Sequence, residues 1–477
     1  MREYNKAFVY FICLSSAMGG LLFGYDWVVI GGAKPFYEEF FHIADSPALQ
    51  GLAMSVSLLG CLLGATLSGA MSDKFGRKLL LIIAAAIFLL SAYATGEVSS
   101  FAGFLVARFF GGIGIGVASN LSPMYIAEVA PAHVRGRLVS LNQLTIVFGI
   151  LGAQIVNWLI AEPVPAGFGP AEILASWNGQ MGWRWMFWAA AFPAALFLLL
   201  ALFLPESPRW LATKGDKKKA EKVLIRIGGE AYAAEELDNM EVAQTSAADG
   251  NSGNTREAAA VQPAEGGLKL LFSHPYRKVL IIGLVVAVFQ QWCGTNVIFN
   301  YAQEIFQSAG FTLDDVLFNI VVTGVVNVIF TFIAIFTVDR FGRRALMMLG
   351  AGGLAGIYII LGTCYFLHMS GILMVVLVVL AIACYAMSLG PVTWVLLSEI
   401  FPNRVRGVAM AVGTFALWAA CFVLTYTFPL LNKALGSSGT FWIYGGICIC
   451  GFVFFLRRLP ETKGKSLEEL EKQLVKE

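Results

Sequence analysis

The sequence of 477 residues is 58% hydrophobic and 13% charged, with a formal net charge of +2 and a mean hydropathy of +0.72. A soluble domain has about 25% charged residues, and this much apolar surface cannot be buried in one soluble core. The composition therefore excludes an ordinary soluble protein and favours a protein embedded in a lipid bilayer. The nearly neutral charge predicts no affinity for nucleic acid.

Apolar stretches recur along the chain at the length that a membrane helix needs, which is about 20 residues. The N-terminal residues run directly into the first stretch without a small-residue cleavage site, so we expect this span to be retained rather than removed as a signal peptide. Because backbone groups in a bilayer must be hydrogen-bonded internally, we expect every span to be an α-helix. The twelve predicted spans lie near residues 8–30, 51–71, 79–96, 101–122, 138–160, 184–204, 277–306, 316–338, 346–367, 372–396, 408–431 and 440–457.

A polar segment divides the spans into two groups of six. Residues 1–204 are predicted to form an N-terminal six-helix bundle and residues 277–457 a C-terminal one. Residues 205–276 are predicted to be a cytoplasmic linker, with short amphipathic helices and then, from Gly228, a flexible stretch. Residues 458–477 resemble a solvated cytoplasmic tail. The predicted fold class is an all-α membrane protein with two pseudo-symmetric bundles.

Lysine and arginine gather in the short loops on one side of the predicted membrane. By the positive-inside rule this side is cytoplasmic, so both termini are predicted to lie in the cytoplasm. The opposite loops carry little positive charge beyond Lys34 and Lys433. The basic loop residues are Lys74, Arg77, Lys78, Arg135, Arg137, Arg340, Arg343, Arg344, Arg404 and Arg406.

Three short motifs recur in the same order in both halves of the chain. SDKFGRK at 72–78 returns as VDRFGRR at 338–344, AEVAPAHVRG returns as SEIFPNRVRG, and PESPR returns as PETKG. Each motif lies on the same side of the membrane as its repeat, so the halves are parallel repeats with an even number of spans in each. The repetition supports six spans plus six, which is the organisation of major facilitator transporters.

Two opposite charges lie inside apolar spans, where each costs about 2.5–3.5 kcal/mol or more. Asp26 lies in the first span and Arg108 in the fourth. Two buried charges of opposite sign favour mutual neutralisation, so one interpretation is a structural ion pair. The other is proton coupling, because an intramembrane acid with one basic partner can bind and release a proton as a cavity opens to either side. We favour proton coupling.

Amide side chains gather in the span that opens the second half, where they need hydrogen-bond partners. An unbroken helix would not place them on one stripe, but they can line a wide cavity, especially if Gly294 loosens the helix. Hydrogen bonds between helices would explain a single amide. A polyol site explains the whole group better, because amides donate and accept hydrogen bonds and an aromatic face stacks on a sugar ring. The candidates are Gln290, Gln291, Asn296 and Asn300, with Gln143, Asn327 and, in the tenth span, Trp394 next to Gly390.

The repeated cytoplasmic motifs carry acidic and basic side chains that can pair. Seven residues separate Glu128 from Arg135 and Glu399 from Arg406, so these residues can pair within a half or between the halves. Solvated pairs contribute little to stability, but a repeated network can also latch one conformation, which is the interpretation we favour. The predicted gate network is Asp73, Arg77, Glu128, Arg135, Glu206, Arg209, Asp339, Arg343, Glu399 and Arg406.

No catalytic set, metal site or cofactor motif is visible in the sequence. The four histidines lie at span ends or in loops, without a nucleophile at motif spacing. The eight cysteines lie in or beside apolar runs and are expected to be small core residues. GGIGIG at 111–116 follows no strand, so it predicts close helix packing rather than a nucleotide site. We expect a protein that is not an enzyme and binds neither metal nor cofactor.

These motifs resemble those of the sugar porter family of the major facilitator superfamily. The shared pieces cover nearly the whole chain: GGLLFGYD, DKFGRK, SPMYIAEVAPAHVRG, PESPRW, QQWCGTN, DRFGRR, GPVTWVLLSEIFPNRVRG and PETKG. The sequence is similar to bacterial xylose/proton symporters, which in turn are similar to the facilitative glucose transporters of animals. The resemblance implies sugar contacts for Gln143, Gln290, Gln291, Asn296, Asn327, Gly390 and Trp394, and proton coupling for Asp26 with Arg108.

Two positions depart from the family pattern and remodel the expected pocket. Asn300 and Tyr301 stand where many relatives carry two tyrosines. Leu417 precedes Trp418, a further candidate for the sugar site, where relatives often place an amide.

The expected function is import of a monosaccharide, a pentose or a hexose, together with a proton by alternating access. One alternative is a proton-independent uniporter, in which Asp26 and Arg108 only hold the bundle together. A less favoured alternative is a transporter-like sugar sensor. The expected partners are a monosaccharide, a proton and the lipid bilayer of the inner (cytoplasmic) membrane. No pattern in the sequence predicts an oligomeric state.

Overall fold

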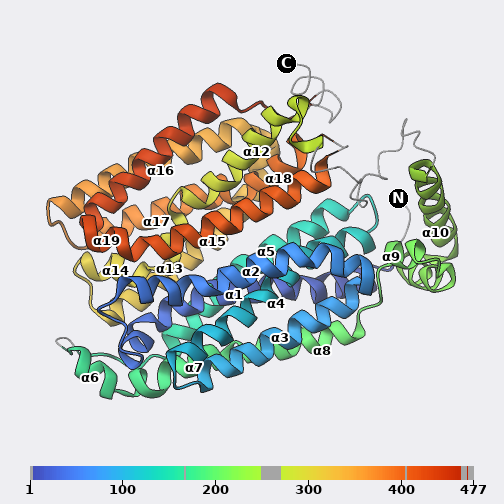
Figure 1. The fold of residues 1–477 in the computed structure, drawn as a ribbon. Helices are drawn as coiled ribbons and strands as arrows, with labels where there is room; N and C mark the ends of the chain where they lie inside the picture. The colour runs from blue at the N-terminus through green and yellow to red at the C-terminus, as the bar shows by residue number, and fades with distance from the viewer. Residues whose placement is uncertain (1–3, 166–167, 249–269, 403–404, 464–469, 471–477) are drawn as a thin grey trace.

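The computed structural model describes residues 4–165, 168–248, 270–402, 405–463 and 470. In this part of the chain the regular elements are helices, and eleven of them are long and apolar enough to cross a membrane. Figure 1 shows them in two bundles that lie along each other, one of blue-to-green N-terminal helices and one of yellow-to-red C-terminal helices. The predicted all-α fold class is confirmed.

The helices of the two bundles follow the predicted spans in order. The first bundle contains α1 (Lys6–Phe40), α2 (Pro47–Phe75), α3 (Arg77–Glu97), α4 (Phe101–Val129), α5 (Arg135–Ile160), the short α6 (Pro170–Ala175), the π-helical η1 (Asn178–Gly182), α7 (Trp183–Ala189) and α8 (Ala191–Phe203). The second contains α12 (His274–Trp292), α13 (Thr295–Asn300), α14 (Ala302–Ser308), α15 (Leu313–Phe341), α16 (Arg343–Phe366), α17 (Ile372–Met387), α18 (Leu389–Ile400) and α19 (Arg406–Arg458).

The last two predicted spans, 408–431 and 440–457, lie in the single element α19. Its 53 residues are interrupted at Gly436, whose backbone is non-helical (φ 67°, ψ 175°). At 1.5 Å per residue an unbroken helix of this length would extend about 80 Å, far more than the hydrocarbon core of about 30 Å. The element therefore accounts for two crossings, and the eleven candidates of the described chain provide the twelve predicted spans.

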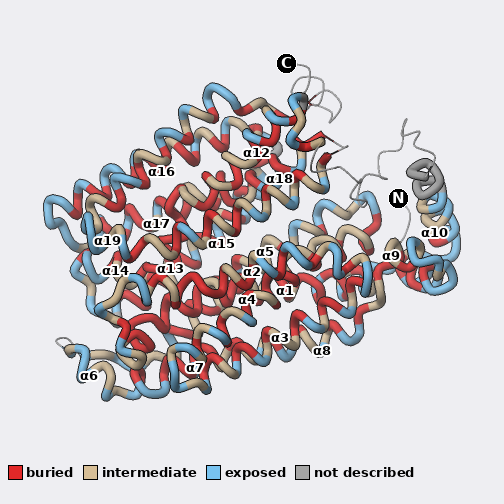
Figure 2. Tube along the Cα trace, viewed as in Figure 1, coloured by how far each residue is buried: buried red, intermediate tan, exposed pale blue. Residues whose placement is uncertain are grey.

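Exposed residues lie on the outer faces of the bundles, and buried residues lie between the helices (Figure 2). Large side chains such as Phe192 (79% exposed) and Phe336 (73%) project outward, where lipid tails replace water as the solvent. Between α2 and α4 the backbones approach closely, because a Cβ on Gly112 would collide with the carbonyl of Ser57. This contact confirms the close helix packing predicted for GGIGIG.

The span predicted near 277–306 is broken into three helices. Gly294 has φ +85°, a left-handed conformation that separates α12 from α13. This glycine was expected from the sequence to loosen the helix. A second break separates α17 from α18 at Ser388. Both breaks lie inside the spans of the C-terminal bundle.

Replacing Gly294 with alanine is expected to destabilise the protein by about 1–3 kcal/mol, because an L-residue is strained at this φ. The new Cβ would also lie 3.0 Å from the Tyr444 ring. The measurement is the thermal midpoint of the purified protein. Gly446→Ala is the matched control, since that helical glycine has nothing within 4 Å of an added Cβ; an equal loss in both variants would contradict the prediction.

Two segments are more helical than predicted. The first span was expected to end near residue 30, but α1 continues to Phe40 through Pro35 and buries Lys34, which the sequence had placed in a loop. The linker was expected to become flexible at Gly228, but α10 (Lys217–Ala248) continues past a kink at Gly229 (φ 83°). Residues 249–269 and most of the predicted tail helix lie outside the described residues.

The linker helices cover one end of the N-terminal bundle, at the right of Figure 1. Trp210 in α9 (Pro208–Thr213) donates a hydrogen bond to the carbonyl of Asp73 at 3.0 Å. The backbone N–H of Asn5 donates to the carbonyl of Ile227 in α10 at 2.8 Å. At the start of α10, a hydrogen bond from the Lys219 ammonium lowers the pKa of the solvated Asp216 carboxyl.

Candidate functional site

Asp26 and Arg108 form a salt bridge inside the N-terminal bundle. Asp26 lies in the middle of α1 and Arg108 on α4, and their side chains are 8% and 4% exposed. The second carboxylate oxygen accepts a hydrogen bond from Ser57 Oγ of α2 at 3.3 Å. The guanidinium lies 5.5 Å from the centre of the Phe187 ring. The pairing predicted for the two buried charges is therefore present, and a proton on Asp26 would leave Arg108 without its counter-charge.

A narrow cavity beside this pair is lined by both halves of the chain. Asp26, Arg108 and the rings of Phe23 and Trp27 line it from the N-terminal half, and Asn300 lines it from α13. Asn300 is 5% exposed, and its Oδ1 has no hydrogen-bond partner among the described residues. The predicted proton-coupling pair and one predicted sugar-binding amide thus share a cavity. The unpartnered oxygen can accept a hydrogen bond from a hydroxyl group.

Three other predicted amides form one chain of hydrogen bonds across the break between α12 and α13. Asn296 Nδ2 donates to Gln291 Oε1, and Gln291 Nε2 donates to Gln290 Oε1 at 2.5 Å. Gln290 Nε2 donates to the hydroxyl of Tyr385 on α17 at 2.6 Å. All three amides are at most 7% exposed. In this structure the amides make their hydrogen bonds with one another. Each amide can replace such a hydrogen bond with one to a sugar hydroxyl.

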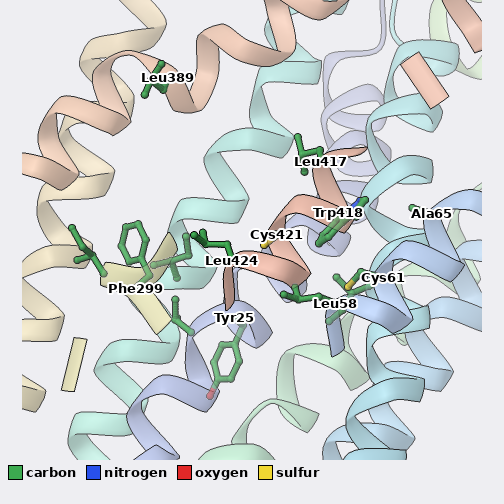
Figure 3. Packing of buried hydrophobic residues seen from close by; sticks show 14 of the residues in the cluster. Tyr25, Leu58, Cys61, Ala65, Phe299, Leu389, Leu417, Trp418, Cys421 and Leu424 are labelled. Carbon is green, nitrogen blue, oxygen red and sulfur yellow. The ribbon is translucent and has the colours of Figure 1, made fainter. Parts of the chain in front are cut away.

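Trp418 belongs to an aromatic cluster that joins the halves. Its ring centre lies 5.7 Å from that of Phe23 and 6.2 Å from that of Trp27, both of which line the cavity. In Figure 3, Trp418 on α19 lies near Leu58 and Cys61 of α2, a helix that packs against α19. The cluster places a tryptophan from the C-terminal half next to the Asp26 cavity.

The remaining predicted sugar contacts are spread around this centre. Gly390 at the start of α18 lies against Tyr385, since an added Cβ would be 3.3 Å from its ring. Trp394, one turn further along α18, is 38% exposed and does not line the Asp26 cavity. Asn327 on α15 is 4% exposed and Gln143 on α5 is half-buried, and neither lines the cavity. Their contact with sugar stays a prediction.

Three buried or half-buried polar residues of the spans were not predicted from the sequence. Ser57 and Tyr385 hold Asp26 and Gln290, but serine and tyrosine hydroxyls recur throughout the spans and gave no distinctive signal. Gln154 on α5 is 2% exposed, and neither of its amide atoms has a hydrogen-bond partner among the described residues. It faces Gly324 of α15, across the boundary between the halves. An amide inside the fifth span was a signal that the sequence did contain.

The first copy of the repeated cytoplasmic motifs is built around Arg77. Its guanidinium pairs with Asp73 at 3.2 Å and with Glu128 at 3.0 Å, with its side chain 4% exposed. The Glu206 carboxylate accepts hydrogen bonds from the backbone N–H groups of Arg77 (2.9 Å) and Lys78 (3.2 Å) at the start of α3. A carboxylate is stabilised there by the unpaired N–H groups and the helix dipole.

The second copy repeats this arrangement in the C-terminal half. Arg343 pairs with Glu399 at 3.0 Å. The Glu461 carboxylate accepts hydrogen bonds from the backbone N–H groups of Arg343 (2.9 Å) and Arg344 (3.1 Å) at the start of α16. Thr462 donates to Glu399 at 2.5 Å. Glu461 was missed in the predicted network, although PETKG repeats PESPR and Glu461 occupies the same position in it as Glu206.

The two arginine–glutamate pairs, Arg77–Glu128 and Arg343–Glu399, each lie within one half. Arg406 donates from Nε to the carbonyl of Phe401 at 3.1 Å, and the side chain of Asp339 lies outside the described residues. A latch between the halves at the cytoplasmic face therefore stays a prediction. The described residues contain no group of three or more His, Cys, Asp or Glu side chains that could hold a metal ion.

Known proteins match this chain along nearly its full length. The D-xylose-proton symporter of Escherichia coli (strain K12) is 38% identical over 502 residues, covering 98% of this chain and 96% of that protein. The arabinose-proton symporter of Bacillus subtilis (strain 168) is 38% identical over 476 residues, covering 100% and 97%. The inward open conformation of the xylose transporter XylE from E. coli superposes with a TM-score of 0.82 at 36% identity, covering 98% of this chain and 100% of that one. The sugar (and other) transporter family model matches residues 12–474, and the chain belongs to this family of membrane transporters.

Proposed function

We propose that the protein imports a monosaccharide together with a proton across the cytoplasmic membrane by alternating access. The observation that carries this proposal is the cavity in which the buried Asp26–Arg108 pair meets Asn300 of the opposite half. A titratable group and a sugar-binding group that share one cavity can influence each other's occupancy. The two relatives named as xylose- and arabinose-proton symporters make pentoses the first class of substrate to test.

In the proposed cycle, a proton from outside binds Asp26 and neutralises the carboxylate that faces Arg108. The sugar then replaces the hydrogen bonds that Asn296, Gln291 and Gln290 make with one another. After the two bundles rock, the cavity opens to the cytoplasm and the sugar and proton leave. The salt bridge between Asp26 and Arg108 then forms again, which is the state that the structure describes.

The proton gradient is large enough for this task. A membrane potential of 100 mV supplies about 2.3 kcal/mol per charge, and one pH unit supplies about 1.4 kcal/mol. Their sum, about 3.7 kcal/mol, corresponds to an accumulation of a few hundred-fold at about 1.4 kcal/mol per tenfold. One proton per sugar is therefore sufficient for strong accumulation.

The test is uptake of labelled pentoses and hexoses into proteoliposomes, with and without an inward proton gradient. Accumulation above equilibrium that collapses on addition of a protonophore is the expected result. Equilibration without accumulation would establish the uniporter instead and leave a structural role for Asp26. Binding without flux would favour the sensor.

The cytoplasmic networks are proposed to stabilise the closed inner gate at another stage of the cycle. Glu206 and Glu461 hold the starts of α3 and α16 in the same way, so the two halves present matching charged surfaces at the cytoplasmic face. When the halves approach, the glutamates and arginines of these surfaces can exchange partners. Both chain ends are proposed to lie on this side, because the basic loops mark it as cytoplasmic.

A further inference from the structure

Lys34 is a buried lysine that the proposed transport cycle leaves unexplained. It lies on α1 beyond Asp26, and its side chain is 2% exposed. Its ammonium contacts Glu38 of the same helix at 2.8 Å and Glu304 of α14 at 2.5 Å. The Glu38 contact lies within the N-terminal half, whereas the Glu304 contact joins the two halves of the chain.

This ion cluster lies at the end of the molecule opposite the linker helices. Figure 1 shows α14 at the left, far from α9 and α10 at the right. Since the linker helices and the basic loops mark the cytoplasmic end, the cluster closes the outer end. The Arg77–Glu128 and Arg343–Glu399 pairs at the cytoplasmic end each stay within one half, whereas the Lys34–Glu304 pair joins the halves at the outer end.

Packed aromatic groups cover the Lys34 side of the pair. The ammonium lies 5.7 Å from the centre of the Tyr301 ring, which packs against Phe428 with ring centres 4.4 Å apart. Tyr301 also donates a hydrogen bond to the carbonyl of Thr425 at 2.6 Å. These contacts place Lys34 between α1, the start of α14 and α19, where an ion pair is screened far less than on a surface.

A second cavity lies on the outer side of the cluster and is lined by both halves. Lys34, Glu38 and Gln50 line it from the N-terminal half, and Glu304, Asn432 and Lys433 from the C-terminal half. Water in this cavity can hydrate the three charges as soon as the halves begin to separate. The arrangement therefore lowers the penalty that a buried pair would meet on opening.

The cluster is also connected to the proposed sugar site through the chain itself. Asn300 ends α13 in the Asp26 cavity, Tyr301 links the two helices, and Glu304 lies in the first turn of α14. A movement of α13 when sugar binds Asn300 or Asn296 would therefore shift the carboxylate that Lys34 holds.

We propose that Lys34, Glu38 and Glu304 form the latch of an outer gate, in which the Lys34–Glu304 pair holds the halves together. Glu38 remains four residues away on the same helix when Glu304 departs, so Lys34 keeps one partner in both states. This proposal rests on the proposed alternating access. In it, one lysine and one glutamate keep the outer gate closed. Of the two ion pairs in the cluster, only Lys34–Glu304 has to separate when the gate opens.

The test measures the distance between spin labels at positions 45 and 433, which are exposed residues of opposite halves beside the outer cavity. The labels are attached in the full-length protein as Asp45→Cys and Lys433→Cys, with the exposed native cysteine removed as Cys450→Ser. Lys34→Met and Glu304→Gln are each expected to raise the population with a long outer distance by about tenfold relative to the unmodified latch. Glu38→Gln is expected to keep the short distance, because the pair between the halves remains.

The control Glu97→Gln changes an exposed carboxylate at the outer end of α3 and is expected to leave the distances unchanged. The exchanged pair, Lys34→Glu with Glu304→Lys, is expected to restore the short distance, which a merely misfolded protein would not do. Unchanged distances in both single variants, or no restoration in the exchanged pair, would overturn the latch. Because the distance measurement needs no transport, a protein that moves no sugar but shows these shifts would refute the proposed function and not the latch.

Discussion

Asp26→Asn is expected to abolish uphill accumulation of sugar while sparing exchange of sugar across the membrane. The amide has nearly the shape of the protonated carboxylate but cannot release a proton, so the variant is held in the proton-bound form. Arg108 and Ser57, which hold the carboxylate, can still hydrogen-bond the amide oxygen. The accumulation ratio in proteoliposomes with a proton gradient is expected to fall from a few hundred-fold to about one.

The matched control for this experiment is Asp238→Asn, on the exposed face of the cytoplasmic helix α10. It makes the same chemical change far from the cavity and is expected to accumulate sugar normally. Exchange of labelled for unlabelled sugar, measured without a gradient, shows that the Asp26→Asn protein is folded and binds substrate. A variant that still concentrates sugar would show that protons are coupled elsewhere or that Asp26 only stabilises the bundle.

The sequence was sufficient to predict the Asp26–Arg108 pair because a charge buried inside the membrane needs a partner of opposite charge. Each charge is too costly to leave alone in an apolar span, and in the six N-terminal spans Asp26 and Arg108 are the acid and the base that lie away from the span ends. The hydroxyl of Ser57 could not be predicted in the same way, since a serine in a span is cheap to bury and gives no signal. Its hydrogen bond to Asp26 depends on how α2 packs against α1 and α4.

Lys34 shows where sequence reasoning failed and why. A lysine followed by proline near the end of an apolar stretch was assigned to an outer loop. Pro35 is nevertheless accommodated within α1, and the helix carries Lys34 inward between two glutamates. Glu304 lies 270 residues further along the chain, and no local pattern links it to Lys34. Only the packing of the two halves brings them together.

The repeated motifs, by contrast, contained a signal for Glu461 that the predicted gate network left out. PESPR and PETKG place one glutamate at the start of α3 and another at the start of α16. Parallel repeats share their local geometry, so a role inferred for Glu206 should have been extended to Glu461. The break at Gly294, by contrast, has a direct cause in one residue, because glycine adopts a left-handed conformation that ends a helix.

Gln291→Leu is expected to weaken sugar binding by about 10- to 100-fold. Gln291 is the middle of the amide chain, accepting from Asn296 and donating to Gln290. The leucine would remove one hydrogen bond to the sugar and leave polar neighbours without a partner, and a buried unsatisfied group costs about 1–3 kcal/mol. Isothermal titration calorimetry on the purified protein measures the Kd, and the thermal midpoint is recorded alongside it. Gln307→Leu, at an exposed position of α14, is the control with the same chemical change.

A panel of monodeoxy sugars separates a contact with sugar from a structural role in this chain. If Gln291 binds one hydroxyl, removing that hydroxyl weakens binding to the natural protein but has little further effect on Gln291→Leu, because the two changes delete the same hydrogen bond. Removal of any other hydroxyl should weaken binding to both proteins equally. If every deoxy sugar loses the same factor in both proteins while the thermal midpoint of the variant falls, the amide chain only joins α12 and α13. The sugar would then be bound by Asn300 and the residues of the Asp26 cavity.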